Sequence, residues 1–278
     1  MRVHVTLVWL AACTGIPGAG PQDANVGPQG IDSDLLPGDG IPPGAIFANG
    51  TAFEDGLPYA GGSSIPNAPI AGVQLCSSGL VTNPCTTTDL DGHYYFVLDG
   101  LLGSDDVPFL LTATASGHLK TSGLGYSSTH LGGWYINYPV ELAMFDDARA
   151  GAFFSAAGFT YPPVASGFVR VVVSEQLIPQ TVEGATVTLT SGSATNAAVY
   201  LDVGSDGREV PNRTLTATGS NGGALFGNVE PGDFSITVTV SGQICTGNGF
   251  SWPGSDGASA SGHLDSGAFT DNVRVFCR

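Results

Sequence analysis

The five cysteines are the residues whose chemistry the sequence constrains most closely. Cys13 follows an N-terminal apolar segment, and the other four lie in the body of the chain: Cys76, Cys85, Cys245 and Cys277. An even number of body cysteines suits an oxidising compartment, where disulfides persist. Their positions favour the pairs Cys76–Cys85 and Cys245–Cys277. Zinc is a poorer alternative, because neither pair has Cys-x-x-Cys spacing and no His is close to either in sequence.

The residues before Cys13 predict that it carries lipid. Leu10-Ala11-Ala12-Cys13 ends the apolar run 5–12, with Arg2 and His4 before it, and resembles the lipobox of bacterial lipoproteins. The resemblance implies that residues 1–12 are a signal peptide, that Cys13 becomes the acylated N-terminus, and that Thr14, in place of Asp, directs the protein to the outer membrane. The run is much shorter than the roughly 20 apolar residues of a transmembrane helix. The predicted membrane contact is therefore the lipid on Cys13, with either a periplasmic or a surface-facing orientation.

The charge of the chain argues against several partners. It has 24 acidic and 8 basic side chains, including a single Lys. Removal of residues 1–12 takes away Arg2 and leaves 7 basic groups, so the mature charge is 7 − 24 = −17. Such a surface repels phosphate backbones and anionic headgroups. We therefore expect no nucleic-acid partner and no electrostatic docking to membranes.

An internal repeat organises the chain after residue 43. Three blocks recur in the same order, pairing 70–75 with 182–187, 88–96 with 218–226, and 109–117 with 234–242. Chance could produce one such pair among Gly- and Thr-rich strands, but three ordered pairs indicate duplication. Residues 13–43, rich in Gly, Pro and Asp and without periodicity, are predicted to form a disordered tether.

Local patterns predict strands in both copies. Val169, Val171 and Val173 alternate with more polar positions, which is the period of a half-buried strand. Asp91-Gly92 and Asn221-Gly222 are typical of hairpin turns, because these residues tolerate positive φ. Many short strands joined by Gly, Pro and Asn predict an all-β fold.

One segment between the copies breaks this pattern. In residues 145–157, Asp146 and Asp147 precede an Ala-rich stretch, and Gly158 follows it. Carboxylates favour a helix N-terminus and Gly favours its end. We expect a short connecting helix.

The repeated blocks resemble the transthyretin-like (prealbumin-like), carboxypeptidase regulatory-like domains. The shared order is apolar-x-Gly-[Ala/Val], then Thr-x-x-[Asp/Asn]-Gly-x-x-x-Phe, then a Thr/Val strand ending in Gly. The resemblance covers about residues 46–143 and 165–278 and implies tandem seven-stranded Greek-key β-sandwiches. The predicted organisation is a signal peptide (1–12), a tether (13–43), sandwich one (44–143), a connector with a short helix (144–164) and sandwich two (165–278). Relatives serve as spacers, sugar-binding modules, adhesin stalks and enzyme appendages, so the fold alone assigns no activity.

Carbohydrate binding is one alternative function that this resemblance raises. Sugar-binding relatives present flat aromatic side chains, and the candidates here are Trp134, Tyr135, Tyr138 and Trp252. Alternation puts Trp134, Ile136 and Tyr138 on one face, which is equally typical of a core strand.

Two other relatives are tested by residue type. Intradiol dioxygenases bind iron through two Tyr and two His, and the first copy contains His93, Tyr94, Tyr95, His118 and His130. The family's His-x-His pair is missing, so an iron enzyme is the remote alternative. Collagen-adhesin B-type stalks form a Lys–Asn crosslink, which the second copy excludes because the only Lys is Lys120. No Gly-x-Ser-x-Gly elbow or phosphate loop with Lys is present.

The sequence thus predicts a non-catalytic, lipid-anchored envelope protein that acts as a structural or binding module. We expect no cofactor and no metal. The expected partners are the membrane, through the lipid on Cys13, and either a glycan or another envelope protein.

Overall fold

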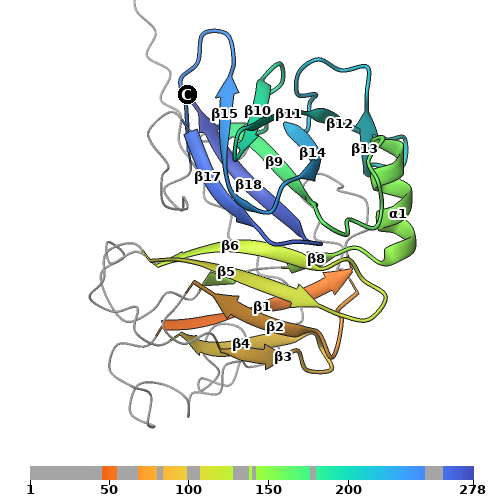
Figure 1. The fold of residues 1–278 in the computed structure, drawn as a ribbon, viewed down its shortest axis with the longest axis vertical. Coiled ribbons are helices and arrows are strands. Elements are labelled where there is room, and N and C mark those ends of the chain that lie inside the picture. The colour runs from red at the N-terminus through yellow and green to blue at the C-terminus, as the bar shows by residue number, and fades with distance from the viewer. Residues whose placement is uncertain are drawn as a thin grey trace, which may run out of the picture. The chain divides into compact units, whose positions relative to one another are not determined.

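The computed structural model describes residues 46–54, 68–79, 84–98, 107–127, 138–139, 142–175, 180–247 and 259–278. The first half of this fold, strands β1 to β8, consists of two β-layers (Figure 1). One layer has the order β4(His93–Leu98)-β1(Ile46–Glu54)-β7(Tyr138–Pro139), with β8(Leu142–Met144) also paired to β1. The other has the order β3(Cys85–Thr87)-β2(Gln74–Ser78)-β5(Val107–Thr114)-β6(Thr121–Ser127).

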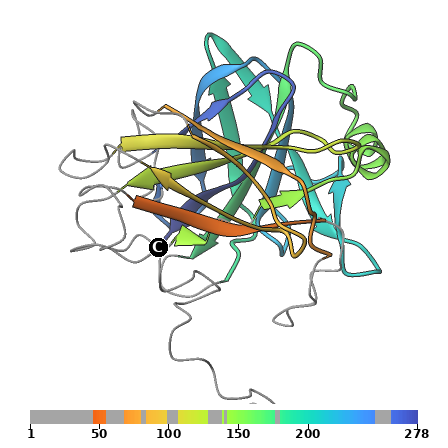
Figure 2. The same ribbon diagram turned by 90° about the horizontal axis from the view of Figure 1, so that it is seen from below.

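The second half, strands β9 to β18, also consists of two layers. The first has the order β13(Glu209–Asn212)-β12(Val199–Val203)-β14(Gly223–Val229)-β9(Gly167–Glu175)-β18(Phe269–Cys277), with β16(Cys245–Gly247) on β18. The second has the order β11(Ala194–Ala197)-β10(Thr186–Ser191)-β15(Gly232–Thr239)-β17(Ser259–Leu264). Figure 2 shows the same strands turned by 90° and seen from below.

The two halves share a common set of strand pairs. β1 is antiparallel to β4 and parallel to β8, as β9 is antiparallel to β14 and parallel to β18. The pairs β2–β3, β2–β5 and β5–β6 correspond to β10–β11, β10–β15 and β15–β17. The predicted duplication is therefore confirmed, and the fold is all-β, with tandem β-sandwiches and one short helix.

A buried threonine in each copy makes the same hydrogen bonds. Thr88 and Thr218 begin the second repeated block in each copy, and both are buried. Each hydroxyl accepts a hydrogen bond from a backbone N–H over 2.9 Å and donates one to a carbonyl over 2.7 Å. The partners are, in that order, Val73 and Ile70 for Thr88, and Ala185 and Val182 for Thr218.

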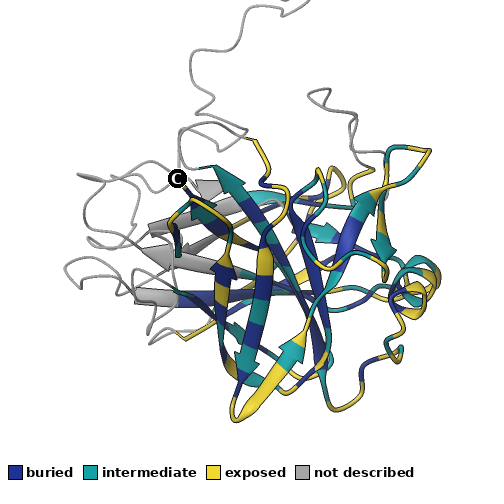
Figure 3. Ribbon diagram, turned by 90° about the horizontal axis from the view of Figure 1, so that it is seen from above, coloured by how far each residue is buried: buried dark blue, intermediate teal, exposed yellow. Residues whose placement is uncertain are grey.

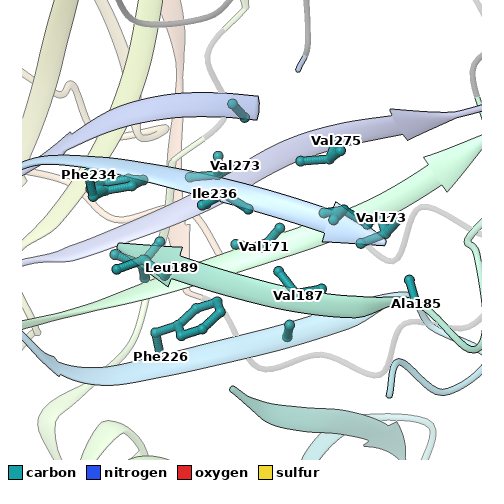
Figure 4. Packing of buried hydrophobic residues seen from close by; sticks show 14 of the residues in the cluster. Val171, Val173, Ala185, Val187, Leu189, Phe226, Phe234, Ile236, Val273 and Val275 are labelled. Atoms are coloured by element: carbon teal, nitrogen blue, oxygen red, sulfur yellow. The ribbon is translucent and has the colours of Figure 1, made fainter. Parts of the chain in front are cut away.

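The predicted strand alternation is also confirmed. Val169, Val171 and Val173 are fully buried, whereas Arg170, between the first two, is only half-buried. Figure 3 shows the same change of burial along other strands. The buried side chains of the second half meet between its two layers, where the valines of β9, together with residues of the neighbouring strands β14 and β18, face residues of β10 and β15 (Figure 4).

The turns at Asp91-Gly92 and Asn221-Gly222 differ from the prediction. Gly92 and Gly222 have φ of 74° and 66°, so the requirement for positive φ was correctly inferred. The interpretation as hairpin turns is wrong, because β3 pairs with β2 while the next strand, β4, pairs with β1, and β13 pairs with β12 and not with the next strand, β14. The first turn therefore carries the chain from one layer to the other. A hairpin and an interlayer turn both need a left-handed residue, so local sequence does not separate them.

The connecting helix is present as α1(Asp147–Ala156). Asp146 is its N-cap, and its side chain accepts a hydrogen bond from the Arg149 N–H over 2.9 Å. Gly158, with φ of 84°, follows the helix, as expected for a helix end.

Candidate functional site

The two halves meet along a pair of strand edges, which we call the joint. β18 runs parallel to β6, with Phe269 opposite Thr121 and Thr270 opposite Ser122. The N–H of Phe269 donates to the Lys120 carbonyl over 2.8 Å. The joint merges one layer of each half into a single ten-stranded sheet (Figure 1).

The two cores lie on opposite faces of this shared sheet. Neighbouring residues of paired strands point to one face, and successive residues of a strand alternate. Phe269 therefore shares a face with Thr121, and Thr121 lies opposite Ala113, a core residue of the first half. Val169 and Val171, beside Phe168 on β9, point to the opposite face and into the second core.

A third buried cluster fills the joint. It contains Leu119 from the first half, Phe145 and Phe154 from the connector, and Phe168 and Phe269 from the second half. The ring of Phe154 stacks on Phe168 with centroids 3.7 Å apart and meets Phe269 edge-on at 5.5 Å. Burying each such side chain stabilises the fold by roughly 1.5–3 kcal/mol. Because Phe154 belongs to α1, the helix is part of the joint core.

A group of polar side chains lies beside the joint. The Lys120 ammonium lies 3.2 Å from Asp265 Oδ2, which also accepts a 3.3 Å hydrogen bond from the Thr112 hydroxyl. His263 Nδ1 lies 2.6 Å from Asp233 Oδ1, and its Nε2 lies 3.9 Å from Asp265 Oδ1. The contacts of Asp265 with Lys120 and Thr112 connect β5 and the start of β6 with the turn between β17 and β18, whereas the His263–Asp233 contact lies within the second half.

His118 lies two residues before Lys120 and is adjacent to Leu119 of the joint cluster. Its Nε2 is 2.6 Å from Glu54 Oε1, and its Nδ1 is 3.0 Å from the Ser116 carbonyl oxygen. Burial lowers the pKa of His118, but the hydrogen bonds to Glu54 and Ser116 and the charges of Glu54 and Asp146 outweigh it and raise the pKa above the ordinary 6.5. The joint thus includes a histidine whose charged form is favoured.

A further ionic network lies on the second half. Arg170 Nη1 is 2.8 Å from Glu209 Oε2, and its Nε is 2.6 Å from Asp271 Oδ1. Asn221 donates to Glu209 over 3.3 Å. The network connects β9, β13 and β18, and every charged group in it is engaged by an opposite charge. We interpret it as structural.

The predicted disulfides are confirmed. Cys76–Cys85 joins register partners on β2 and β3, and Cys245–Cys277 joins register partners on β16 and β18. The lipidation candidate Cys13 lies outside the described residues.

The predicted sugar-binding residues are not described at the level of their side chains. Trp134, Tyr135 and Trp252 lie outside the described residues, and of Tyr138 only the backbone, in β7, is described. Their role in sugar binding therefore stays a prediction.

The iron-ligand candidates do not converge in the described part of the fold. Tyr94 is buried in the first core, whereas His93 and Tyr95 on either side of it are exposed. Both ring nitrogens of His118 are already engaged, and His130 lies outside the described residues. No group of three or more His, Cys, Asp or Glu side chains in the described ranges is arranged to hold a metal ion.

The joint itself was missed by sequence reasoning. One signal was available: the connector (144–164) contains Phe145, Phe153, Phe154, Phe159 and Tyr161, which is an unusual aromatic density for a linker. All five belong to the joint cluster or pack against it.

No family model and no curated protein matches the chain. Within the described residues, no helix has the length and apolarity to cross a bilayer. Solved structures with similarity include the Bacillus anthracis TIE protein (10% identity, TM-score 0.26) and a streptococcal ancillary pilin (10%, 0.25). GBS52, the minor pilin of Streptococcus agalactiae, is 11% identical with a TM-score of 0.26.

The matches cover 84%, 84% and 83% of this chain, and 34%, 62% and 95% of those proteins, respectively. The chain thus spans about a third of the first protein and less than two thirds of the second. At these TM-scores the likeness carries no functional argument, and the fold rests on the strand pairing described above.

Proposed function

We propose that this chain is a lipid-anchored protein of the cell envelope that displays two joined β-sandwiches as a non-catalytic structural or binding module. The observation that supports it best is the joint. A shared sheet and a buried aromatic cluster hold the halves in one compact unit, residues 44–278. A module of this kind keeps a fixed spacing between its two ends, which suits display or spacing more than a hinged enzyme.

Several features support an envelope location. Two disulfides suit an oxidising compartment, and the acidic surface suits solubility outside the cytoplasm. The sequence Leu10-Ala11-Ala12-Cys13 resembles a lipobox, and Thr14 favours the outer membrane. Two or more acyl chains on Cys13 would give stable attachment, because one chain alone binds only marginally.

Metabolic labelling tests the anchor. The full chain should incorporate labelled palmitate and fractionate with outer membranes. The Cys13→Ala variant should lose the label and become soluble, while the matched Thr14→Ala variant keeps the label because its cysteine is intact. An unlabelled wild-type protein, or a Cys13→Ala variant that is labelled equally, would refute the anchor.

Distance measurement tests the module. Spin labels on non-natural amino acids at Leu90 in the first half and Thr195 in the second would report the spacing, because both side chains are exposed. We expect one narrow distance distribution for the wild-type background. The Phe154→Ala variant should broaden it by removing a central ring of the joint. A broad distribution in the wild-type background would contradict the proposal.

A further inference from the structure

The segment 118–122 carries the strand pairing of the first half across the joint. Leu119 enters the buried cluster, the Lys120 carbonyl receives the Phe269 N–H, and Thr121 and Ser122 pair with β18. His118 is the first residue of this segment, and its ring connects it to Glu54 at the end of β1. The contact of the His118 ring with Glu54 is therefore one of the interactions that position the segment.

The surroundings of that ring require two protons. The Ser116 carbonyl oxygen, 3.0 Å from Nδ1, can only accept a hydrogen bond. The Glu54 carboxylate, 2.6 Å from Nε2, is also an acceptor. Neutral imidazole has a single N–H, so only the imidazolium satisfies both contacts together.

The nearby charges also favour the imidazolium form of His118. Glu54 faces His118 from β1, and Asp146 acts on it from the N-cap of α1. Both are acidic. The backbone adds further links, since the Leu119 N–H donates to the Phe145 carbonyl and the Asp147 N–H donates to the Gly117 carbonyl, both over 2.9 Å. The segment around His118 thus contacts the start of the helix that fills the joint.

We propose that His118 is a pH-sensitive latch for the joint. As the imidazolium, it holds the start of segment 118–122 against β1 and the start of α1. When the ring loses a proton, one of its two contacts must be given up, and the strand pairing between β6 and β18 opens more often. This inference does not depend on the lipid anchor.

The direction follows from linkage. The pKa of His118 is raised in the folded state. The stabilisation that protonated His118 gives to the folded joint is therefore fully present below the unfolded-state pKa of about 6.5. It is lost as the pH rises through the higher folded-state pKa. The joint should be tightest in mildly acidic solution and weaken above neutrality.

Hydrogen exchange of single amides tests the latch on the full chain. The Leu119 and Phe269 N–H groups bond to the Phe145 and Lys120 carbonyls and report the joint. After correction for intrinsic exchange, their protection factors should fall between pH 6 and pH 8.5. The Val173 N–H, which bonds to the Gly222 carbonyl within the second half, serves as the internal reference.

Matched histidine variants decide the assignment. His118→Gln should abolish the fall in protection, whereas His93→Gln should behave as wild type, because His93 is exposed and lies 4.0 Å from Asp89. If His118→Gln does not fold, Glu54→Gln should shift the fall to lower pH by removing the carboxylate. Protection that does not depend on pH in the wild type, or an unchanged fall in His118→Gln or Glu54→Gln, would overturn the proposal.

Discussion

The side chains of Lys120 and Asp265 form an ion pair across the joint, with Nζ and Oδ2 separated by 3.2 Å. Lys120 precedes β6 in the first half, and Asp265 lies between β17 and β18 in the second. The chain's only Lys is thus paired with a carboxylate of the other half. Both side chains are 32% exposed, so water and salt screen the pair.

This screening predicts a small and salt-dependent contribution. Lys120→Met should lower the free energy of unfolding by less than about 1 kcal/mol at low salt, and the effect should nearly vanish in molar salt. Urea unfolding at two salt concentrations measures it. Arg208→Met is the control, because Arg208 pairs with Asp206 in a turn of the second half, 3.7 Å away. A large loss that persists in high salt would show that the pair is buried more deeply than described.

The buried threonine of each copy should contribute strongly. Replacing Thr88 or Thr218 by Val leaves a backbone N–H and a carbonyl without their side-chain partner. An unsatisfied buried polar group is destabilising by about 1–3 kcal/mol, so each substitution should lower the free energy of unfolding by about 1–3 kcal/mol or more. The matched Ser variants keep the hydroxyl and should be nearer to wild type. Equal stability of the Val and Ser variants would remove the assigned role.

Two glycines near the joint should respond to alanine in opposite directions. A Cβ on Gly227 would overlap the ring of Phe159, so Gly227→Ala should be destabilising by roughly 1–3 kcal/mol through overpacking. A Cβ on Gly151, inside α1, would lie 3.5 Å from the Tyr161 ring, an ordinary contact. Gly151→Ala should therefore be stabilising by up to about 1 kcal/mol through helix propensity. Thermal unfolding of both variants checks the signs, and a shift of both in one direction would contradict the packing.

The two disulfides should differ in accessibility to reductant. Cys85 is exposed, whereas Cys245 and Cys277 are 8% and 0% exposed. Because thiol exchange needs access to sulfur, mild reductant should open Cys76–Cys85 first. Alkylation and mass spectrometry of the native protein would identify the first thiols, and early labelling of Cys277 would be inconsistent with its burial.

Their contributions to stability should also differ. The Cys76–Cys85 and Cys245–Cys277 pairs are 9 and 32 residues apart. In the chain-entropy model, the shorter loop stabilises by about 3 kcal/mol and the longer by about 4 kcal/mol. Denaturation of the protein before and after selective reduction of Cys76–Cys85 measures the contribution of the shorter loop.

The elements that local sequence predicted share a physical basis. Period-2 valines, the Asp146 cap before α1 and the repeated Thr-x-x-[Asp/Asn]-Gly block each report interactions among residues close in sequence or within one copy. The disulfide pairs were predictable for the same reason, since each lies within one half.

The joint depends on a different kind of interaction. Its strand pairing uses backbone groups of Thr121 and Phe269, which any residue possesses. Leu119, Phe168 and Phe269 have the composition of ordinary core residues, and nothing in their spacing identifies a third cluster. Edge-to-edge pairing of two folded units leaves little mark on sequence, so only the aromatic density of the connector indicated it.

The ten-stranded sheet limits how this protein can be divided. A fragment ending before residue 167 would uncover the β6 edge and the side chain of Leu119, and a fragment beginning there would uncover the β18 edge and the ring of Phe269. Open edges beside apolar rings promote self-association. We therefore expect that neither half is stable when it is separated from the other, and that the two copies are retained together in evolution.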